Sequence, residues 1–358
     1  MGRYTHPFLR SSTMPRLQQI AQYGQQIWLD NLSRHLLDSG ELARWILDDA
    51  IAGVTSNPAI FYNAIKNDAG YQADLARIKS EVAEPEARFE ALVLPDIRRA
   101  CDILRPVYDE SSGERGFVSF EVAPALAHDA AATLAAARRL WAAIDRPNAM
   151  IKIPATQAGM TAIAAAIEAG INVNVTLIFG PRQLAAVHAA HRQGLEARAA
   201  KGQAVAGIAS VASVFISRID TLLDPQLPPE LQGKIAIASA RAAYGRWKEL
   251  PPLPAGAAPQ KLLWASTSSK NPAYRDVIYV EDLIGPGTVN TVPDATLAAF
   301  RDHGKAAATL ECCQAENHSL LAALAARGID MDQIGDELLS AGLKQFEEAF
   351  AKLLELVA

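Results

Sequence analysis

The sequence has little of what a disulfide-stapled, membrane-spanning or nucleic-acid-binding protein needs. Only three cysteines occur in 358 residues. Two of them, Cys312 and Cys313, are adjacent, which suits neither a disulfide framework nor the spacing of a zinc site. No run of about 18 apolar residues is present, which excludes a membrane-spanning helix. The net charge is −5 without a run of Lys and Arg, so nucleic acid and anionic membranes are poor candidate partners.

The three cysteines and the first residues bear on location and domain boundaries. Reduced thiols in a cytoplasm are the simplest interpretation of so few cysteines. Residues 1–13 are polar and lack the apolar run of a secretory signal, so we predict an N-terminal extension there. Met14 opens a chain that becomes helical at once through 16–20. The remaining residues, 14–358, are predicted to form one domain, because half of the sequence is hydrophobic and can bury a large core.

The apolar pattern alternates between two periods along the chain. Short β-branched runs are separated by longer Ala- and Leu-rich segments with helical spacing, which is typical of βα units around a parallel sheet. The runs predict strands at 27–30, 53–57, 117–122, 150–154, 173–179, 208–215, 262–266 and 288–293. Eight such strands predict an α/β fold, a single (β/α)8 TIM barrel.

Segments of helical spacing lie between the predicted strands. Three of them are rich in Ala, Leu and Arg and predict helices of the outer ring at 130–144, 160–169 and 181–201. The Pro-rich segment 250–259 predicts a surface loop before the seventh strand. The last segment, 331–358, predicts a helix that packs across the barrel. Cys312 and Cys313 fall in a predicted late helix, where buried apolar packing is expected.

In a barrel of this kind the catalytic groups lie where strands end and loops begin. The residues that close the predicted strands are unusually polar. They are Asp30, Thr55, Asn57, Glu121, Lys152, Asn174, Thr176, Ser213 and Ser266.

Lys152 stands in the apolar run Met150-Ile151-Lys152-Ile153-Pro154. Desolvation there would lower the pKa of the amine and favour its neutral, nucleophilic form, which can form a Schiff base. The alternative is a lysine at a strand end that reaches out to solvent.

The other polar residues also allow two interpretations each. Glu121 could relay protons for Lys152 or form a structural salt bridge with it. Asp30, which precedes a helix, could be a base or an N-cap. The Thr55 to Asn57 segment could form an Asx turn, and Asn174 and Thr176 could be ordinary hydrogen bonders.

Four of these stretches together resemble the transaldolase family. The segment Gly53-Val54-Thr55-Ser56-Asn57-Pro58-Ala59-Ile60-Phe61 is similar to its first signature. The segment Ile151-Lys152-Ile153-Pro154-Ala155-Thr156, followed by Gly159, is similar to the second, which contains the Schiff-base lysine. Two further stretches, 174–179 and 213–218, resemble the motifs of the fifth and sixth strands. The resemblance extends from about Gln18 to the end of the chain.

The resemblance implies a reaction and a role for each residue. A dihydroxyacetone unit would move from sedoheptulose 7-phosphate to glyceraldehyde 3-phosphate, giving erythrose 4-phosphate and fructose 6-phosphate in the non-oxidative pentose phosphate pathway. Lys152 would form the imine, and Glu121 with Thr176 would hold the water that shuttles protons. Asp30 would take the proton of the C4 hydroxyl. The hydroxyls of the dihydroxyacetone unit would be bound by Asn57 and Asn174, with Ser213 helping to hold the sugar.

The phosphate end departs from the family pattern. Arg218 matches a family position and offers a planar fork suited to phosphate. Many members have Ala-Ser-x-Arg at the seventh strand, where this chain has Ala265-Ser266-Thr267-Ser268 and therefore lacks the arginine. Lys270 could supply the missing charge, or it could be a solvated loop lysine.

Two competing functions remain open at the level of sequence. A fructose 6-phosphate aldolase would release free dihydroxyacetone, but such relatives are shorter and tend to carry Tyr where this chain has Phe215, whose apolar ring would protect the enamine from protonation. A non-catalytic sugar-phosphate sensor should lack Lys152, Glu121 or Asp30, and all three are present. No metal or organic cofactor is expected, because the protonated imine is itself the electron sink. Family likeness suggests a homodimer.

Overall fold

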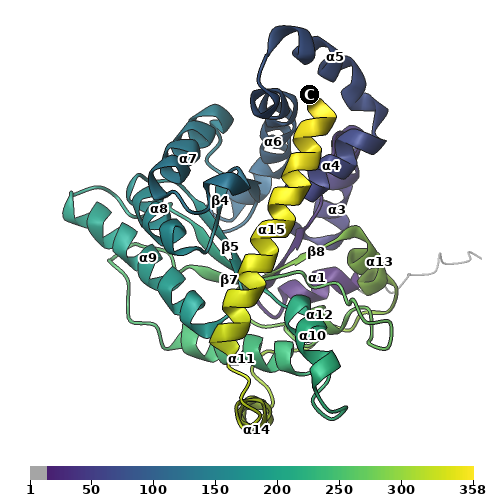
Figure 1. The fold of residues 1–358 in the computed structure, drawn as a ribbon, viewed down its shortest axis with the longest axis vertical. Helices are drawn as coiled ribbons and strands as arrows, with labels where there is room; N and C mark the ends of the chain where they lie inside the picture. The colour runs from purple at the N-terminus through teal and green to yellow at the C-terminus, as the bar shows by residue number, and fades with distance from the viewer. Residues whose placement is uncertain (1–13) are drawn as a thin grey trace, which may run out of the picture.

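The fold is a closed barrel of eight parallel strands, each bonded to the next and β8 bonded to β1. The structure is a computed structural model that describes residues 14–358, so the predicted extension 1–13 lies outside the described residues. The strands are β1 (Gln25–Leu29), β2 (Ile51–Thr55), β3 (Phe117–Glu121), β4 (Ala149–Pro154), β5 (Val173–Ile178), β6 (Ser210–Phe215), β7 (Lys261–Ala265) and β8 (Thr288–Val292). The predicted (β/α)8 barrel is confirmed (Figure 1).

The predicted strands all exist, but several of their ends differ. Three polar residues that were expected to close strands lie just beyond them: Asp30, Asn57 and Ser266. Asn57 instead caps a helix, since its side chain accepts a hydrogen bond from the Ile60 amide. Ser266 adopts a left-handed conformation with φ +54°, which ends the strand. The side chains of Asn57 and Ser266 bond to helices and that of Asp30 bonds Thr55 of β2, so the apolar period could not fix these boundaries.

Helices surround the barrel as a ring. They are α1 (Arg16–Ala21), α2 (Arg34–Asp38), α3 (Glu41–Asp49), α4 (Pro58–Asn67), α5 (Gln72–Glu81), α6 (Pro85–Glu110), α7 (Ala130–Ile144), α8 (Gln157–Glu168), α9 (Pro181–Ala200), α10 (Ser217–Leu223), α11 (Ile235–Lys248), α12 (Ile278–Glu281), α13 (Asp294–His303), α14 (Gln314–Ala325) and α15 (Met331–Val357). The helix predicted at 130–144 is confirmed to the residue. α8 begins earlier than predicted because the Thr156 side chain caps it, accepting from the Gly159 amide at 2.8 Å.

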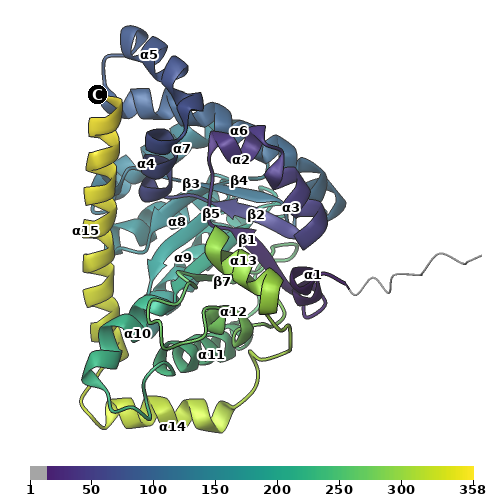
Figure 2. The same cartoon turned by 90° about the vertical axis from the view of Figure 1, so that its right-hand side faces the viewer.

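The last helix, α15, crosses the barrel as predicted. It appears as the yellow helix running across the strands in Figure 1 and along one side of the molecule in Figure 2. Its buried face includes Leu338, Phe346, Phe350 and Leu353, and Phe350 stacks edge-on against Phe89 of α6. This apolar stripe fixes α15 over the barrel and brings it close to the strand ends.

The interpretation of the adjacent cysteines was wrong. Cys312 and Cys313 precede α14 instead of lying within a helix, and Cys313 takes a left-handed conformation with φ +61°. Cys313 is exposed and Cys312 partly exposed, whereas Cys101 is buried. The Pro-rich segment 250–259 contains no helix or strand, in agreement with the predicted loop. Among the described residues, no helix is long and apolar enough to cross a membrane.

Candidate active site

A cavity of about 190 Å³ lies at the carboxyl ends of the strands. Ten of the twelve site residues proposed from the sequence line it: Asp30, Thr55, Asn57, Lys152, Thr176, Ser213, Phe215, Arg218, Ser266 and Lys270. The remaining two, Glu121 and Asn174, do not contribute to the wall and are buried behind it. Residues from seven strand ends or the loops that follow them thus meet in one place, because all parallel strands of a barrel end on the same side.

Lys152 points into the barrel and away from bulk solvent. Lys152 is only 5 % exposed, so the alternative interpretation, a lysine that reaches out to solvent, is wrong. The Nζ atom donates a hydrogen bond to the Ser56 carbonyl at 3.1 Å and lies 3.5 Å from Oε2 of Glu121. The ring of Phe346, from α15, lies 5.8 Å from the same atom. The amine is therefore held at the cavity wall by one carbonyl, one carboxyl group and one aromatic ring.

Glu121 is paired with Lys152 both in register and through its side chain. The two residues are partners in the β3–β4 ladder. Burial raises the pKa of Glu121 to about 7, while the charge of Lys152 and its hydrogen bond lower it and the charge of Asp30 raises it. Within residues 14–358, Oγ1 of Thr176 is buried without a hydrogen-bond partner, and Oε2 of Glu121 is buried with the long 3.5 Å contact to Lys152 beside it. Such unsatisfied atoms are rare in protein interiors and indicate a place for a small polar molecule.

The side chain of Asp30 forms a hydrogen bond inside the barrel and caps no helix. Its Oδ1 accepts a hydrogen bond from Thr55 Oγ1 at 2.7 Å, and the same hydroxyl lies 2.6 Å from Oγ1 of Thr291. Burial raises the pKa of Asp30, against the lowering effects of Lys152, the Thr55 hydrogen bond and Lys270. The N-cap interpretation is wrong, because the next helix, α2, is capped by Ser33.

The two asparagines differ in their access to the cavity. Asn57 lines it while its Oδ1 accepts from the Ile60 amide at 3.0 Å, so its amide nitrogen is left for a ligand. Asn174 donates to Ser119 Oγ at 3.0 Å and accepts from Ser213 Oγ at 2.7 Å. Asn174 therefore lies behind Ser213 and supports it, because β5 and β6 are neighbouring strands.

In the part of the chain that the structure describes, no acidic side chain pairs with Arg218. Within residues 14–358 it makes neither a salt bridge nor a hydrogen bond through its side chain, and its guanidinium lies 5.2 Å above the ring of Phe215. Burial lowers the pKa of Arg218. A Cβ at Gly342 of α15 would lie 3.0 Å from Leu177 Cδ2 and 3.3 Å from Nη1 of Arg218, so glycine there lets the helix approach the arginine. A partly buried cation without an anion favours an anionic ligand.

Lys270 brings a second positive charge to the same end of the cavity. It lies on the loop after β7, and its Nζ donates to Ser268 Oγ. Desolvation lowers the pKa of Lys270, the charge of Arg218 lowers it further, and Asp30 opposes both. The loop is anchored below by Tyr274, whose hydroxyl donates to Asp224 at 2.7 Å. Ser266 bonds Ser217 through their hydroxyls at 3.0 Å, which ties this loop to α10.

Several residues of the site were not found from the sequence. Thr291, Ser268 and Phe346 line the cavity, and the Ser56 carbonyl holds the amine of Lys152. Thr291 lies near the end of the eighth predicted strand, 288–293, and could have been found by the same rule that selected Thr55. Phe346 gave no signal beyond the apolar stripe of its helix, because only packing shows that α15 reaches the cavity.

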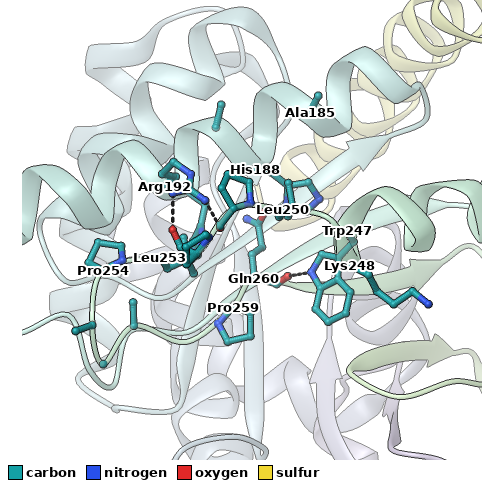
Figure 3. A pocket seen from close by; sticks show the side chains of 17 residues that line it. Ala185, His188, Arg192, Trp247, Lys248, Leu250, Leu253, Pro254, Pro259 and Gln260 are labelled. Atoms are coloured by element: carbon teal, nitrogen blue, oxygen red, sulfur yellow. Dashed lines mark hydrogen bonds between the residues drawn. The ribbon is translucent and has the colours of Figure 1, made fainter.

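A larger cavity, of about 900 Å³, lies between outer helices of the barrel and a loop, away from the carboxyl ends of the strands (Figure 3). It is lined by α9, the end of α11 and the Pro-rich loop that precedes β7, so it opens beside the amino ends of the strands. Arg192 fastens that loop by donating to the Pro252 carbonyl at 2.8 Å, and Trp247 donates to the Gln260 carbonyl at 2.7 Å. None of the proposed site residues contributes to it. A choice by volume alone would have selected the wrong cavity, because the ionisable side chains converge on the smaller cavity at the carboxyl ends of the strands.

Metal-binding side chains do not gather in the described part of the chain. No group of three or more His, Cys, Asp or Glu residues there could hold a metal ion. Burial raises the pKa of both acidic groups of the candidate site, Asp30 and Glu121, and the positive charge of Lys152 opposes that rise in each. The chemistry that this arrangement offers is nucleophilic attack by an amine with carboxyl groups as proton carriers.

Comparison with known proteins gives a consistent result. The model of the family described as transaldolase/fructose-6-phosphate aldolase matches residues 27–357. A transaldolase of Neisseria gonorrhoeae is 51 % identical over 348 residues, covering 95 % of this chain and 99 % of that protein. A transaldolase of Thiobacillus denitrificans is 48 % identical over 351 residues, covering 94 % and 98 %. A protein of Nostoc sp. named transaldolase 2 is 44 % identical over 364 residues, covering 94 % and 95 %.

Proposed function

The chain belongs to the transaldolase/fructose-6-phosphate aldolase family and is an enzyme, a transferase of the transaldolase type, and from this premise we propose that Lys152 carries a dihydroxyacetone unit from a ketose phosphate to an aldose phosphate. The donor is sedoheptulose 7-phosphate and the acceptor glyceraldehyde 3-phosphate, with the reaction reversible. The observation that carries the proposal is the buried amine of Lys152, 3.5 Å from a carboxyl group, in a cavity that is also lined by Arg218, which has no salt bridge within residues 14–358.

The first chemical step joins the sugar to Lys152. The neutral amine attacks the C2 carbonyl, and the resulting carbinolamine loses its hydroxyl as water to give a protonated imine. Glu121 and Thr176 support this step, because the buried hydroxyl of Thr176 and the carboxyl group of Glu121, whose Oε2 is only in long contact with Lys152, can together hold the water that carries protons. Glu121 has a pKa of about 7, close to the value at which one group can both accept and return a proton.

The second step breaks the bond between C3 and C4. Asp30 takes the proton of the C4 hydroxyl, the aldose phosphate leaves, and the bonding electron pair moves to C3 and into the imine as an enamine. Thr55 orients the carboxyl group through its 2.7 Å hydrogen bond. The apolar ring of Phe215 limits protonation of the enamine by water, so the carbanion equivalent attacks the acceptor aldehyde instead. Asn57 and Ser213 bind hydroxyls of the bound unit, with Asn174 supporting Ser213.

The experiment that tests the proposal is reduction of the imine with borohydride. Treatment of the protein with fructose 6-phosphate and borohydride, followed by peptide mass mapping, should give one stable adduct, on Lys152. A sample reduced without sugar serves as the control. An adduct on another lysine, or none, would overturn the mechanism.

We propose that Lys270 replaces the arginine missing after the seventh strand. Replacing Lys270 by Ala should raise KM for fructose 6-phosphate about tenfold to 100-fold with a smaller change in kcat, because a charge-assisted contact to phosphate contributes about 1.5–3 kcal/mol. Adding Ser268→Arg to that variant should restore KM, since Lys270 and Ser268 touch and the arginine would return to its family position. Lys352→Ala, on the exposed face of α15, is the matched control. An unchanged KM in the Lys270 variant would show that this lysine is a solvated loop residue.

Glu121 should control the pH dependence of the reaction. Its folded-state pKa of about 7 lies above the ordinary 4.5 because of burial, so the group is protonated below pH 7 and can accept a proton only above it. We therefore expect log kcat/KM to rise with pH and to level off above an inflection near 7. Glu121→Gln should lose this inflection and at least about 100-fold in rate. An inflection that persists unchanged in the variant would exclude Glu121 as the titrating group.

The same raised pKa has a consequence for stability. The folded protein binds this proton more tightly than the unfolded chain, so the stabilising contribution of Glu121 is present below pH 4.5 and is lost as pH rises through about 7.

As for assembly and location, we propose a homodimer that acts in the cytoplasm on sugar phosphates. The homodimer and the compartment stay predictions.

A further inference from the structure

Cys312 and Cys313 bring their sulfur atoms together although they are neighbours in the chain. The two Sγ atoms lie 3.0 Å apart. Adjacent side chains point to opposite faces of a strand and about 100° apart on a helix, so neighbouring cysteines do not ordinarily meet. Here the left-handed conformation of Cys313, with φ +61°, turns its side chain back toward Cys312. The outcome is a preformed dithiol on the surface, since Cys313 is exposed and Cys312 partly exposed.

Hydrogen bonds hold this turn in place. The buried Asn317 donates from Nδ2 to the Cys312 carbonyl at 3.2 Å and from its backbone amide to the Cys313 carbonyl at 2.9 Å. On the other side, the Leu310 amide donates to the Ile284 carbonyl at 3.0 Å. The backbone that carries both thiols is thus held by the start of α14 and by the segment before it.

The geometry disfavours a disulfide between these residues. Neighbouring Cα atoms are about 3.8 Å apart across a trans peptide, whereas disulfides usually span about 4.4–6.8 Å between Cα atoms. Disulfide formation also proceeds through a thiolate, and burial together with the hydrogen bond from Cys313 raises the pKa of Cys312. A reagent that places one atom between the sulfurs and reacts with neutral thiols meets neither obstacle.

We propose that Cys312 and Cys313 form a binding site for trivalent organic arsenicals, which bridge the two sulfurs through one arsenic atom. With the arsenical as its hydrate, which carries two hydroxyl groups on arsenic, two arsenic–oxygen bonds break and two arsenic–sulfur bonds form, and each thiol proton leaves with one hydroxide as water. Arsenic stays trivalent and no oxidant or reductant takes part. Transition-metal ions fit less well, because they require further ligands and the described residues offer no group of three metal-binding side chains.

A cavity beside the dithiol fits the organic substituent. It has a volume of about 320 Å³, and its wall includes Cys312, Tyr244, Leu310 and Leu321. Tyr244 and Leu310 are buried and present apolar surface, which suits an aromatic ring. No residue of this cavity lines the catalytic cavity. The site is therefore independent of Lys152 and of the proposed reaction.

The test uses the full-length, reduced protein and phenylarsine oxide. Intact mass and titration of free thiols should show one arsenical bound per chain with the loss of two reactive thiols, and peptide mapping of the wild-type protein should place the adduct on the peptide with Cys312 and Cys313. The adduct should be released by a small dithiol but not by an equal concentration of a monothiol. Release by the monothiol would mean attachment through one sulfur and would overturn the proposal.

Variants separate a bridged adduct from a single attachment. Cys312→Ser and Cys313→Ser should each bind phenylarsine oxide at least about 100-fold more weakly, because the second sulfur acts at a high effective concentration. Cys101→Ser, which removes the buried thiol, should bind like the wild type. Binding that survives in Cys313→Ser, or a disulfide that forms between the pair in peroxide while phenylarsine oxide leaves no adduct, would overturn the proposal. Retained adduct formation in Lys152→Met would show that the site works without the catalytic amine.

Discussion

Replacing Lys152 by Met should lower kcat by at least about 10⁴-fold, because the amine is the nucleophile and no other lysine lines the cavity except Lys270. Methionine keeps the length and the apolar stem of the side chain, so the packing against Phe346 is retained. The variant should also give no adduct with fructose 6-phosphate and borohydride. Steady-state kinetics and intact mass measure both effects.

Loss of folding must be separated from loss of chemistry in that experiment. Removing one partner of a buried ion pair commonly destabilises a protein by about 3–5 kcal/mol. The double variant Lys152→Met, Glu121→Gln removes both partners and should recover stability without recovering activity. Lys261→Met, which removes a half-buried lysine at the other end of β7, is the matched control and should remain active. Activity of the Lys152 variant within tenfold of the wild type would exclude the Schiff base.

Replacing Asp30 by Asn should lower kcat about 10²- to 10⁴-fold while leaving imine formation intact. Asparagine can still accept the hydrogen bond from Thr55, so the geometry around the cavity is kept. It cannot accept the proton of the C4 hydroxyl, so the reaction should stop before the C3–C4 bond breaks. Borohydride should then trap the whole ketose phosphate on Lys152, whereas the wild type should also yield the three-carbon unit left after cleavage.

A neighbouring carboxylate provides the control for Asp30. Asp294 starts α13, and burial raises its pKa as well, but it binds Asn31 and does not line the cavity. Asp294→Asn should therefore keep activity near that of the wild type. If the Asp30 variant cleaved the sugar normally, or if it trapped only the three-carbon unit, another group would have to be the base.

Most of the fold and much of the site could be predicted from the sequence. The eight strands follow from the period of the β-branched runs, and the polar residues closing them could be selected because a parallel barrel gathers strand ends on one side. The error on Asp30 concerns an interaction between segments that are distant in the chain. Asp30 satisfies the N-cap pattern locally, yet Ser33 caps the helix and Asp30 bonds Thr55 on the next strand.

By itself, the sequence determined the barrel, the position of Lys152 in an apolar strand and the set of polar residues at the strand ends, because side-chain periodicity and strand order are local properties of the chain. Only the tertiary structure decided which groups touch the amine, that Asn174 stands behind Ser213, that Phe346 of α15 lines the cavity, and that Gly342 lets α15 approach Arg218. The physical reason is that these contacts join segments as many as about 200 residues apart, where the closing helix packs on the barrel as a whole and no local pattern records its approach.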